Sequence, residues 1–175
     1  KKEVVEIGIR DFYQEMVDHP DVFPKTSMPS VQDFYEVFEK SVKENIPLIC
    51  ICITAKFSGS LQSATTAKDM ILEEYPEAKI AVIDSLSASA GELNIALFIR
   101  DLCEKELPFE EICRQTEAYR DSMNTYFVIE TLDFLKKNGR LTGLTAFIAS
   151  ALNIKPVMGA DSGTIIKLDQ ARGMT

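Results

Sequence analysis

The sequence has no tryptophan, a single histidine and no long hydrophobic run. Its longest strongly apolar stretch, residues 46–53, is interrupted by Pro47, whereas a membrane-spanning helix needs about 20 apolar residues. The first residues, Lys1-Lys2-Glu3, show no secretory signal, so we expect a cytoplasmic protein without an integral membrane segment. The lone His19 stands in a turn-like stretch, which disfavours histidine-based hydrolase mechanisms.

The residue patterns of common cofactor and metal sites are also missing. There is no Gly-x-x-x-x-Gly-Lys phosphate loop, no Gly-x-Gly-x-x-Gly dinucleotide motif, and no base paired with a nucleophile. Cys50 and Cys52 alternate with isoleucines and so share one face of a strand, while Cys103 and Cys113 fall in separate helical patterns. We therefore expect no cofactor, no metal site, and four buried, reduced thiols.

Positive charge is scarce over most of the chain. The 19 basic and 27 acidic side chains give a net charge of −8, which argues against nucleic acid as a partner. The deficit is confined to residues 1–135, because residues 136–175 carry six basic and only two acidic side chains. An anionic ligand or partner is therefore expected to meet the last quarter of the chain.

Strand and helix patterns alternate over the first part of the sequence. Helical spacing of apolar residues predicts a helix over residues 3–17 and another from Ser30, whose side chain suits an N-cap. Residues 48–54 and 79–83 are apolar runs typical of buried parallel strands. Helices are expected over 60–75, 89–106 and 108–123. This order predicts a Rossmann-like parallel-sheet α/β domain over residues 1–124.

The pattern changes in the polar stretch around residue 124, where we place a domain boundary. We expect strands at 126–129, 154–158 and 164–168, a short helix ending at Asn138-Gly139, and a helix over 142–152. The last two strands are joined by Asp161-Ser162-Gly163, a hairpin turn. The sequence therefore predicts that a second α/β domain, with a partly antiparallel sheet, begins at residue 125.

Two hydroxyl-rich turns are candidates for a binding site. Ser58-Gly59-Ser60 follows the 48–54 strand and opens a helix, where hydroxyls, backbone N–H groups and the helix dipole could hold a carboxylate or phosphate. The alternative is that the serines only cap the helix and the glycine only permits the turn. Thr26-Ser27, in a proline-containing turn, are either further donors or solvated loop residues.

The basic last quarter supplies a third candidate. It combines Asn138-Gly139-Arg140, Asn153-Ile154-Lys155-Pro156 and Arg172, which bring amide and cationic groups into one region of the sequence. This set is either an anion-binding cluster or a solvated face with ordinary helix-end charges. The residue pattern by itself leaves both interpretations open.

Five ordered motifs, taken together, make the sequence similar to a known family, DegV. They are Thr26-Ser27-Met28-Pro29-Ser30, Phe57-Ser58-Gly59-Ser60-Leu61-Gln62-Ser63-Ala64, Val82-Ile83-Asp84-Ser85, Thr131-Leu132-Asp133-Phe134-Leu135-Lys136-Lys137-Asn138-Gly139-Arg140, and Leu152-Asn153-Ile154-Lys155-Pro156. DegV proteins are bacterial fatty-acid-binding proteins, and some present acyl chains to a fatty acid kinase.

The resemblance implies roles for particular residues. Thr26, with Ser27 beside it, and Ser58 resemble the family's hydroxyl groups that hold a fatty-acid carboxylate between two domains. Gly59 stands where the backbone approaches the head group. Arg140 and Arg172 resemble basic residues near the mouth, where acyl-phosphate formation and kinase docking are expected. On this basis the chain is a lipid-binding protein without its own catalytic machinery, with a long-chain fatty acid and a fatty acid kinase as partners.

The chain also departs from the family pattern. Ser60-Leu61 stands where the family commonly has Thr-Tyr, and Asn138 where it commonly has Gly. Family members are longer, so we expect this sequence to be the middle of a longer protein, with the first strand missing and the second domain truncated. Two alternatives stay open: a small phosphotransferase that uses the Ser58-Gly59 turn, and a protein-interaction domain whose basic last quarter docks an acidic partner.

Overall fold

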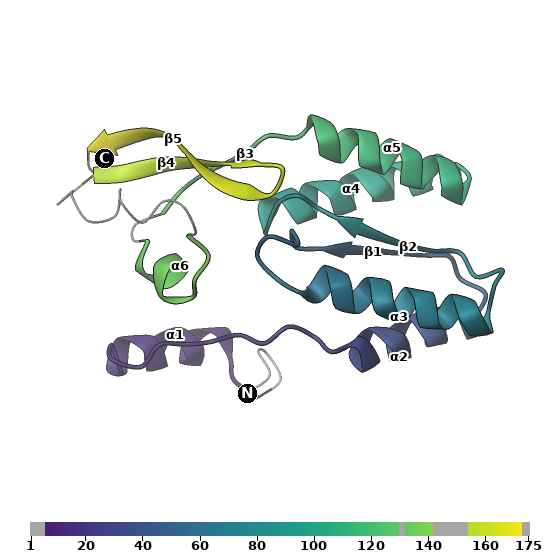
Figure 1. Ribbon diagram of the computed structural model, residues 1–175, viewed down its shortest axis with the longest axis horizontal. Coiled ribbons are helices and arrows are strands. Elements are labelled where there is room, and N and C mark those ends of the chain that lie inside the picture. The colour runs from purple at the N-terminus through teal and green to yellow at the C-terminus, as the bar shows by residue number, and fades with distance from the viewer. Residues whose placement is uncertain (1–5, 130–131, 142–153, 173–175) are drawn as a thin grey trace.

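The computed structural model describes residues 6–129, 132–141 and 154–172, and shows a mixed α/β fold with two sheets (Figure 1). The first sheet pairs β1 (Leu48–Cys52) with β2 (Ile80–Asp84) in parallel. The second is antiparallel in the order β3-β4-β5, formed by Thr125–Val128, Ile154–Asp161 and Thr164–Arg172. The predicted fold class, a parallel sheet followed by an antiparallel one, is confirmed.

The helices lie close to their predicted positions. They are α1 (Ile9–Asp18), α2 (Val31–Lys43), α3 (Ser60–Glu74), α4 (Ala90–Glu104), α5 (Phe109–Ser122) and α6 (Asp133–Lys137). The first helix begins at Ile9 and not at residue 3 as predicted, and residues 6–8 before it are not helical. The helix expected over 142–152 lies outside the described residues. Among the described helices, none is long and apolar enough to cross a membrane.

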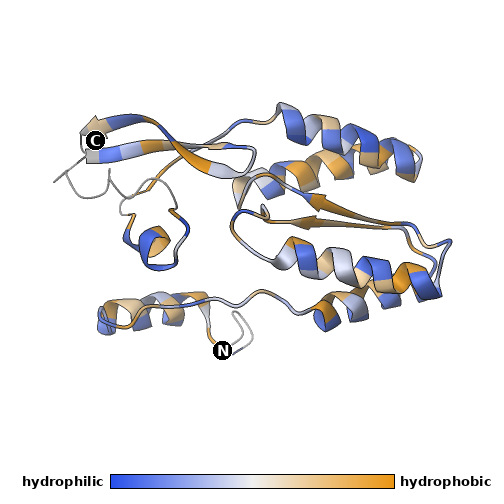
Figure 2. Cartoon of the chain, viewed as in Figure 1, coloured by the Kyte–Doolittle hydropathy of each residue, from blue (hydrophilic) through white to orange (hydrophobic). Residues whose placement is uncertain are grey.

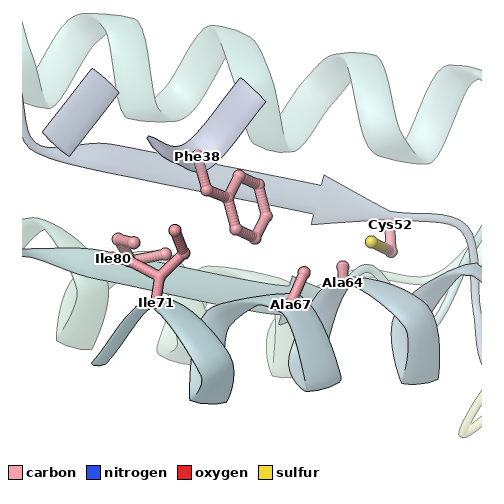
Figure 3. Close-up of a cluster of buried hydrophobic side chains, with 6 residues drawn as sticks. All are labelled: Phe38, Cys52, Ala64, Ala67, Ile71 and Ile80. Atoms are coloured by element: carbon pink, nitrogen blue, oxygen red, sulfur yellow. The ribbon is translucent and has the colours of Figure 1, made fainter. Parts of the chain in front are cut away.

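Helices cover both faces of the parallel sheet. In Figure 1, α2 and α3 lie on one side of β1 and β2, and α4 and α5 lie on the other. Both strands are strongly hydrophobic, as Figure 2 shows, which fits strands that are covered on two sides. The core beneath α3 is built from six buried side chains that converge in Figure 3, namely Phe38, Cys52, Ala64, Ala67, Ile71 and Ile80.

Local hydrogen bonds fix two parts of the chain near the site, namely the start of α2 and the loops that follow β1 and β2. Ser30 caps α2 as predicted, because its hydroxyl accepts from the Asp33 backbone N–H at 3.1 Å and the Asp33 carboxylate accepts from the Ser30 N–H at 2.7 Å. At the end of β2, the Asp84 carboxylate accepts from the N–H groups of Ala55 and Leu86, at 3.3 and 2.8 Å. Asp84 therefore ties together the loops that follow β1 and β2.

The β4–β5 hairpin turns through Ser162 and Gly163, whose φ angles of 48° and 79° are those of a type I′ turn. A Cβ on Gly163 would overlap the Thr54 hydroxyl, so the hairpin tip packs closely against the end of β1. The antiparallel sheet begins at Thr125, and the proposed division into two domains at residue 124 stays a prediction.

The cysteines differ from expectation in one respect. Cys50 and Cys52 share a face of β1, as predicted, with their Sγ atoms 3.8 Å apart. However, Cys103 is exposed, so the expectation that all four thiols are buried is wrong. Helix α4 turns Ile95 and Leu102 into the core, and Cys103, one residue further along the helix, falls on the outward side.

Candidate ligand-binding cleft

A cleft of about 740 Å³ opens beyond the carboxyl end of β1, where parallel sheets place their ligands. Three segments form it: residues 26–29 before α2, the turn after β1, and the end of α6 with the residues that follow. We call it the mouth cleft. It is lined by Thr26, Ser27, Met28, Pro29, Ile53, Ala55, Lys56, Phe57, Ser58, Gly59, Ser60, Phe134, Leu135, Asn138, Gly139 and Arg140.

Five of the six predicted site residues come together in the mouth cleft: Thr26, Ser27, Ser58, Gly59 and Arg140. They derive from segments more than 110 residues apart in sequence. The sixth, at position 172, is the last residue of β5, and its side chain lies outside the described residues. The structure thus places the residues together, and their roles stay a prediction.

The turn after β1 supports the start of α3 and also lines the cleft, while its role in holding an anion stays a prediction. The Ser58 hydroxyl accepts from the Ser60 N–H at 3.2 Å and lies 2.8 Å from the Ser60 hydroxyl, so it supports the start of α3. It also faces the cleft. Gly59 has a φ of −74°, which any residue can adopt. Its lack of a side chain matters for spacing, since a Cβ there would lie 2.5 Å from the Met28 Sδ.

Arg140 is tied to the same turn. Its Nε donates to the Phe57 carbonyl at 3.1 Å, and its Nη1 donates to the Asn138 carbonyl. Helix α6 ends just before it, where Gly139 adopts a φ of 69° that favours glycine and reverses the chain. The guanidinium is therefore held beside the Ser58 turn, although its partner Phe57 is 83 residues away in sequence.

The mouth cleft is suited to an anion. Its described lining contains Lys56 and Arg140 and no acidic side chain, in a chain whose net charge is −8. Helix α3, which begins at the cleft, is the only described helix without an acidic residue in its first turn, so its dipole lacks an intrinsic counter-charge. The sequence did not predict that Lys56 belongs to this site, because nothing in its pattern distinguishes it from a solvated lysine.

A second, apolar cavity adjoins the mouth cleft. This chamber of about 370 Å³ shares Phe57 and Leu135 with the cleft. Its lining is small or apolar, apart from a few hydroxyls, and comprises Thr54, Phe57, Ser87, Ala88, Ser89, Ala90, Gly91, Thr125, Tyr126, Phe127, Ile129, Leu135, Ala160, Gly163 and Ile165. The Ser87 and Thr125 hydroxyls bind each other at 2.8 Å. We call it the apolar chamber, and no residue pattern in the sequence predicts its position.

Comparison with known proteins places this geometry in a family. The model of the DegV family, described as an uncharacterised protein family, matches residues 1–175. A DegV domain-containing protein of Streptococcus pneumoniae is 40% identical over 151 residues, which cover 85% of this chain and 52% of that protein. A DegV domain-containing protein of Clostridium perfringens is 32% identical over 169 residues, 96% of this chain and 59% of that protein. The chain thus spans between half and three-fifths of the length of these relatives.

Solved structures agree with this assignment. A stearic acid-binding protein from Eubacterium ventriosum superposes with a TM-score of 0.84 at 35% identity, covering 98% of this chain and 58% of that one. The Streptococcus pneumoniae Fatty Acid Kinase (Fak) B3 protein, loaded with linoleic acid, gives a TM-score of 0.80 at 36% identity, covering 93% and 58%. From the match over its whole length and these structural neighbours, the chain belongs to the DegV family.

Proposed function

We propose that this chain binds a long-chain fatty acid, with its carboxylate in the mouth cleft and its hydrocarbon in the apolar chamber. The observation that carries the proposal is the junction of the two cavities at Phe57 and Leu135. One cavity offers hydroxyls and two cations, and the other offers an apolar wall. An amphiphile with one anionic end matches this pairing better than a wholly polar ligand does.

The carboxylate is the part of the ligand that needs hydrogen-bond donors from the protein, because removing a charge from water is costly unless several donors replace the water. The hydroxyls of Thr26 and Ser27 make no hydrogen bond to another described residue, and both residues are exposed at the cleft. They are therefore available to donate to a carboxylate together with Ser58. Hydrogen bonds of this charge-assisted kind are shorter and stronger than neutral ones.

The hydrocarbon supplies most of the affinity. Each buried methylene contributes about 0.8 kcal/mol before the costs of association, so a long acyl chain has ample driving force. The Ser87 and Thr125 hydroxyls satisfy each other, and therefore the chamber wall presents little unpaired polarity to the chain. A volume of about 370 Å³ also lies within the usual range of small-molecule sites.

Structural neighbours support the choice of ligand. The proteins from Eubacterium ventriosum and Streptococcus pneumoniae are described as binding stearic acid and as loaded with linoleic acid. A DegV protein from Ruminococcus gnavus, 39% identical with a TM-score of 0.82, is described with vaccenic acid. These chain types differ in unsaturation, and we extend to the present chain only what they share, a long-chain fatty acid.

We further propose that the protein presents its ligand to a fatty acid kinase and has no catalytic activity of its own. The exposed position of Thr26 and Ser27 leaves the carboxylate end accessible to a second protein. Within the described residues we find neither a nucleotide-binding loop nor three His, Cys, Asp or Glu side chains placed to hold a metal. Phosphorylation of the carboxylate would then use ATP bound by the kinase.

The test is to purify the complete gene product from cells, extract it, and analyse the extract by mass spectrometry. We expect a long-chain fatty acid in near-stoichiometric amount, and acyl phosphate when the loaded protein meets a fatty acid kinase and ATP. Folded protein that neither carries nor takes up a fatty acid would refute the binding proposal. Retained binding without acyl phosphate would refute only the kinase partnership.

A further inference from the structure

Residues 19–30, which we call the strap, link α1 to α2 without helix or strand structure and carry Thr26 and Ser27 across the mouth cleft. In the view of Figure 1, α1 and α6 lie on the same side of the molecule, from which the strap runs to α2. Helix α1 has no buried residue, so it offers the strap little anchorage at its N-terminal end. Contacts other than those of α1 must therefore hold the strap over the cleft.

Near its N-terminal end the strap contacts α6 through the aromatic ring of Phe23. Its ring lies 4.6 Å from the ring of Phe134, centroid to centroid, at an interplanar angle of 31°. The Lys137 ammonium stands 3.8 Å from the centroid of the same Phe23 ring. Phe134 and Lys137 are three residues apart on α6, so both reach Phe23 from one helix face.

The other end of the strap is held separately. Met28 lies against Gly59 so closely that a Cβ there would be 2.5 Å from its Sδ, and Ser30 is fixed by its capping interaction with Asp33. Thr26 and Ser27 therefore span the interval between two anchors, one on each side of the mouth cleft. Loss of the Phe23 anchor would leave the strap attached at one end only.

We propose that Phe23, held between Phe134 and Lys137, is a latch that fixes the strap over the mouth cleft and limits the rate at which a bound fatty acid leaves. Phe134 itself lines the cleft, so the latch stands at its rim. Phe23 acts through Thr26 and does not line the cleft, which makes it a positioning residue. This inference rests on the proposed function.

The experiment compares matched pairs of variants in the complete gene product. Phe23→Ala removes the latch, whereas Phe109→Ala removes a ring of a second cation–aromatic pair, with Lys79 Nζ 6.0 Å from its centroid, away from the cleft. Lys137→Met removes the clamping charge, and Lys136→Met removes an adjacent charge that no contact ties to Phe23. Phe23→Tyr keeps an aromatic ring at the latch.

Two readouts are needed. In the ligand-free protein, amide hydrogen exchange over residues 19–30 is expected to rise in Phe23→Ala and stay unchanged in Phe109→Ala. In the loaded protein, transfer of a fluorescent long-chain fatty acid to acceptor vesicles is expected to be about tenfold faster in Phe23→Ala and about threefold faster in Lys137→Met, given the usual strength of ring and cation–ring contacts. Phe23→Tyr should restore the wild-type rate, and both control variants should match wild type.

The outcomes separate the latch from the function on which it rests. If wild type binds fatty acid and Phe23→Ala releases it at the wild-type rate, or no faster than Phe109→Ala, the latch is overturned and the proposed function stands. If exchange over residues 19–30 does not change in Phe23→Ala, the latch is likewise overturned. If wild type retains no fatty acid at all, the proposed function fails and the inference fails with it.

Discussion

The hydroxyl oxygens of Ser87 and Thr125 lie 2.8 Å apart, in a hydrogen bond that joins the loop after β2 to the first strand of the antiparallel sheet. Ser87 is 3% exposed, and its N–H and carbonyl both bind the Ser85 hydroxyl, at 3.2 and 3.0 Å. Ser87 is thus fixed by its backbone and by its side chain. A Cβ placed on Gly91 would overlap that side chain.

We therefore predict that Gly91→Ala lowers the free energy of unfolding by about 2 kcal/mol or more, the cost of overpacking against a neighbour that cannot move. Gly59→Ala is the matched control. Its neighbour Met28 is 54% exposed and can swing aside, so a loss below about 1 kcal/mol is expected. Urea denaturation of both variants measures the difference, and equal losses would contradict the argument.

A substitution at Thr26 should lower fatty-acid affinity without lowering the stability of the fold. Thr26→Val keeps the shape of the side chain and removes a hydroxyl that has no partner among the described residues, so the melting temperature should hardly change. Fatty-acid affinity should fall at least about tenfold, since a hydrogen bond to a charged group contributes roughly 1.5–3 kcal/mol. Isothermal titration calorimetry and thermal unfolding of the same preparation give both quantities.

Ser58→Ala should behave differently from Thr26→Val. The Ser58 hydroxyl also supports the start of α3, and loss of such a contact costs about 1 kcal/mol of stability. We expect both affinity and melting temperature to fall. If Thr26→Val lowered stability as much as Ser58→Ala does, or left affinity unchanged, the assignment of Thr26 to the carboxylate would be wrong.

Arg140 contributes a positive charge and a hydrogen bond to the Phe57 carbonyl, and two substitutions distinguish these contributions. Arg140→Lys keeps the charge and loses the Nε donor to the Phe57 carbonyl, whereas Arg140→Met loses both. We expect affinity to fall in the order wild type, Lys, Met. The affinity of the Lys variant should still weaken as salt is added, and that of the Met variant should depend less on salt. Identical affinities and salt dependences for the two variants would contradict a role for the charge.

Much of the fold follows from local sequence. The apolar runs of β1 and β2, the cap at Ser30, and the turn at Ser162-Gly163 are set by periodicity and turn chemistry within a few residues, and all lie where expected. The motif residues at 26–27, 58–59 and 140 could also be proposed, because a resemblance carried by several motifs indicates which side chains gather around a ligand.

The features that could not be predicted depend on contacts between distant segments. Arg140 contacts Phe57 across 83 residues of sequence, and the chamber walls come from the antiparallel sheet, the loops after β1 and β2, and the start of α4. Neither arrangement follows from the periodicity of the sequence. Lys56 belongs to the cleft through its position in a turn, which charge counting alone does not distinguish from a solvated lysine. Exposure of Cys103 likewise depends on how α4 is rotated against the sheet, since its apolar pattern is compatible with more than one rotation.

The cysteines give a prediction that tests this rotation. Cys103 is exposed, whereas Cys113 is half-buried and burial raises the pKa of its thiol. The hydrogen bond to Cys50, together with burial, raises the pKa of the Cys52 thiol further. Because each unit of pKa increase lowers the thiolate fraction about tenfold, Cys52 should be the least reactive.

We expect native protein treated with iodoacetamide near pH 8 to be alkylated first at Cys103, then at Cys113, and last at Cys52, whose modification requires local opening of the core under α3. Peptide mapping by mass spectrometry follows each site over time. Cys103→Ser should abolish the fast phase, Cys113→Ser should leave it intact, and in urea all sites should react at similar rates. If peptide mapping shows that Cys103 is alkylated no faster than Cys113, the outward placement of Cys103 on α4 is wrong.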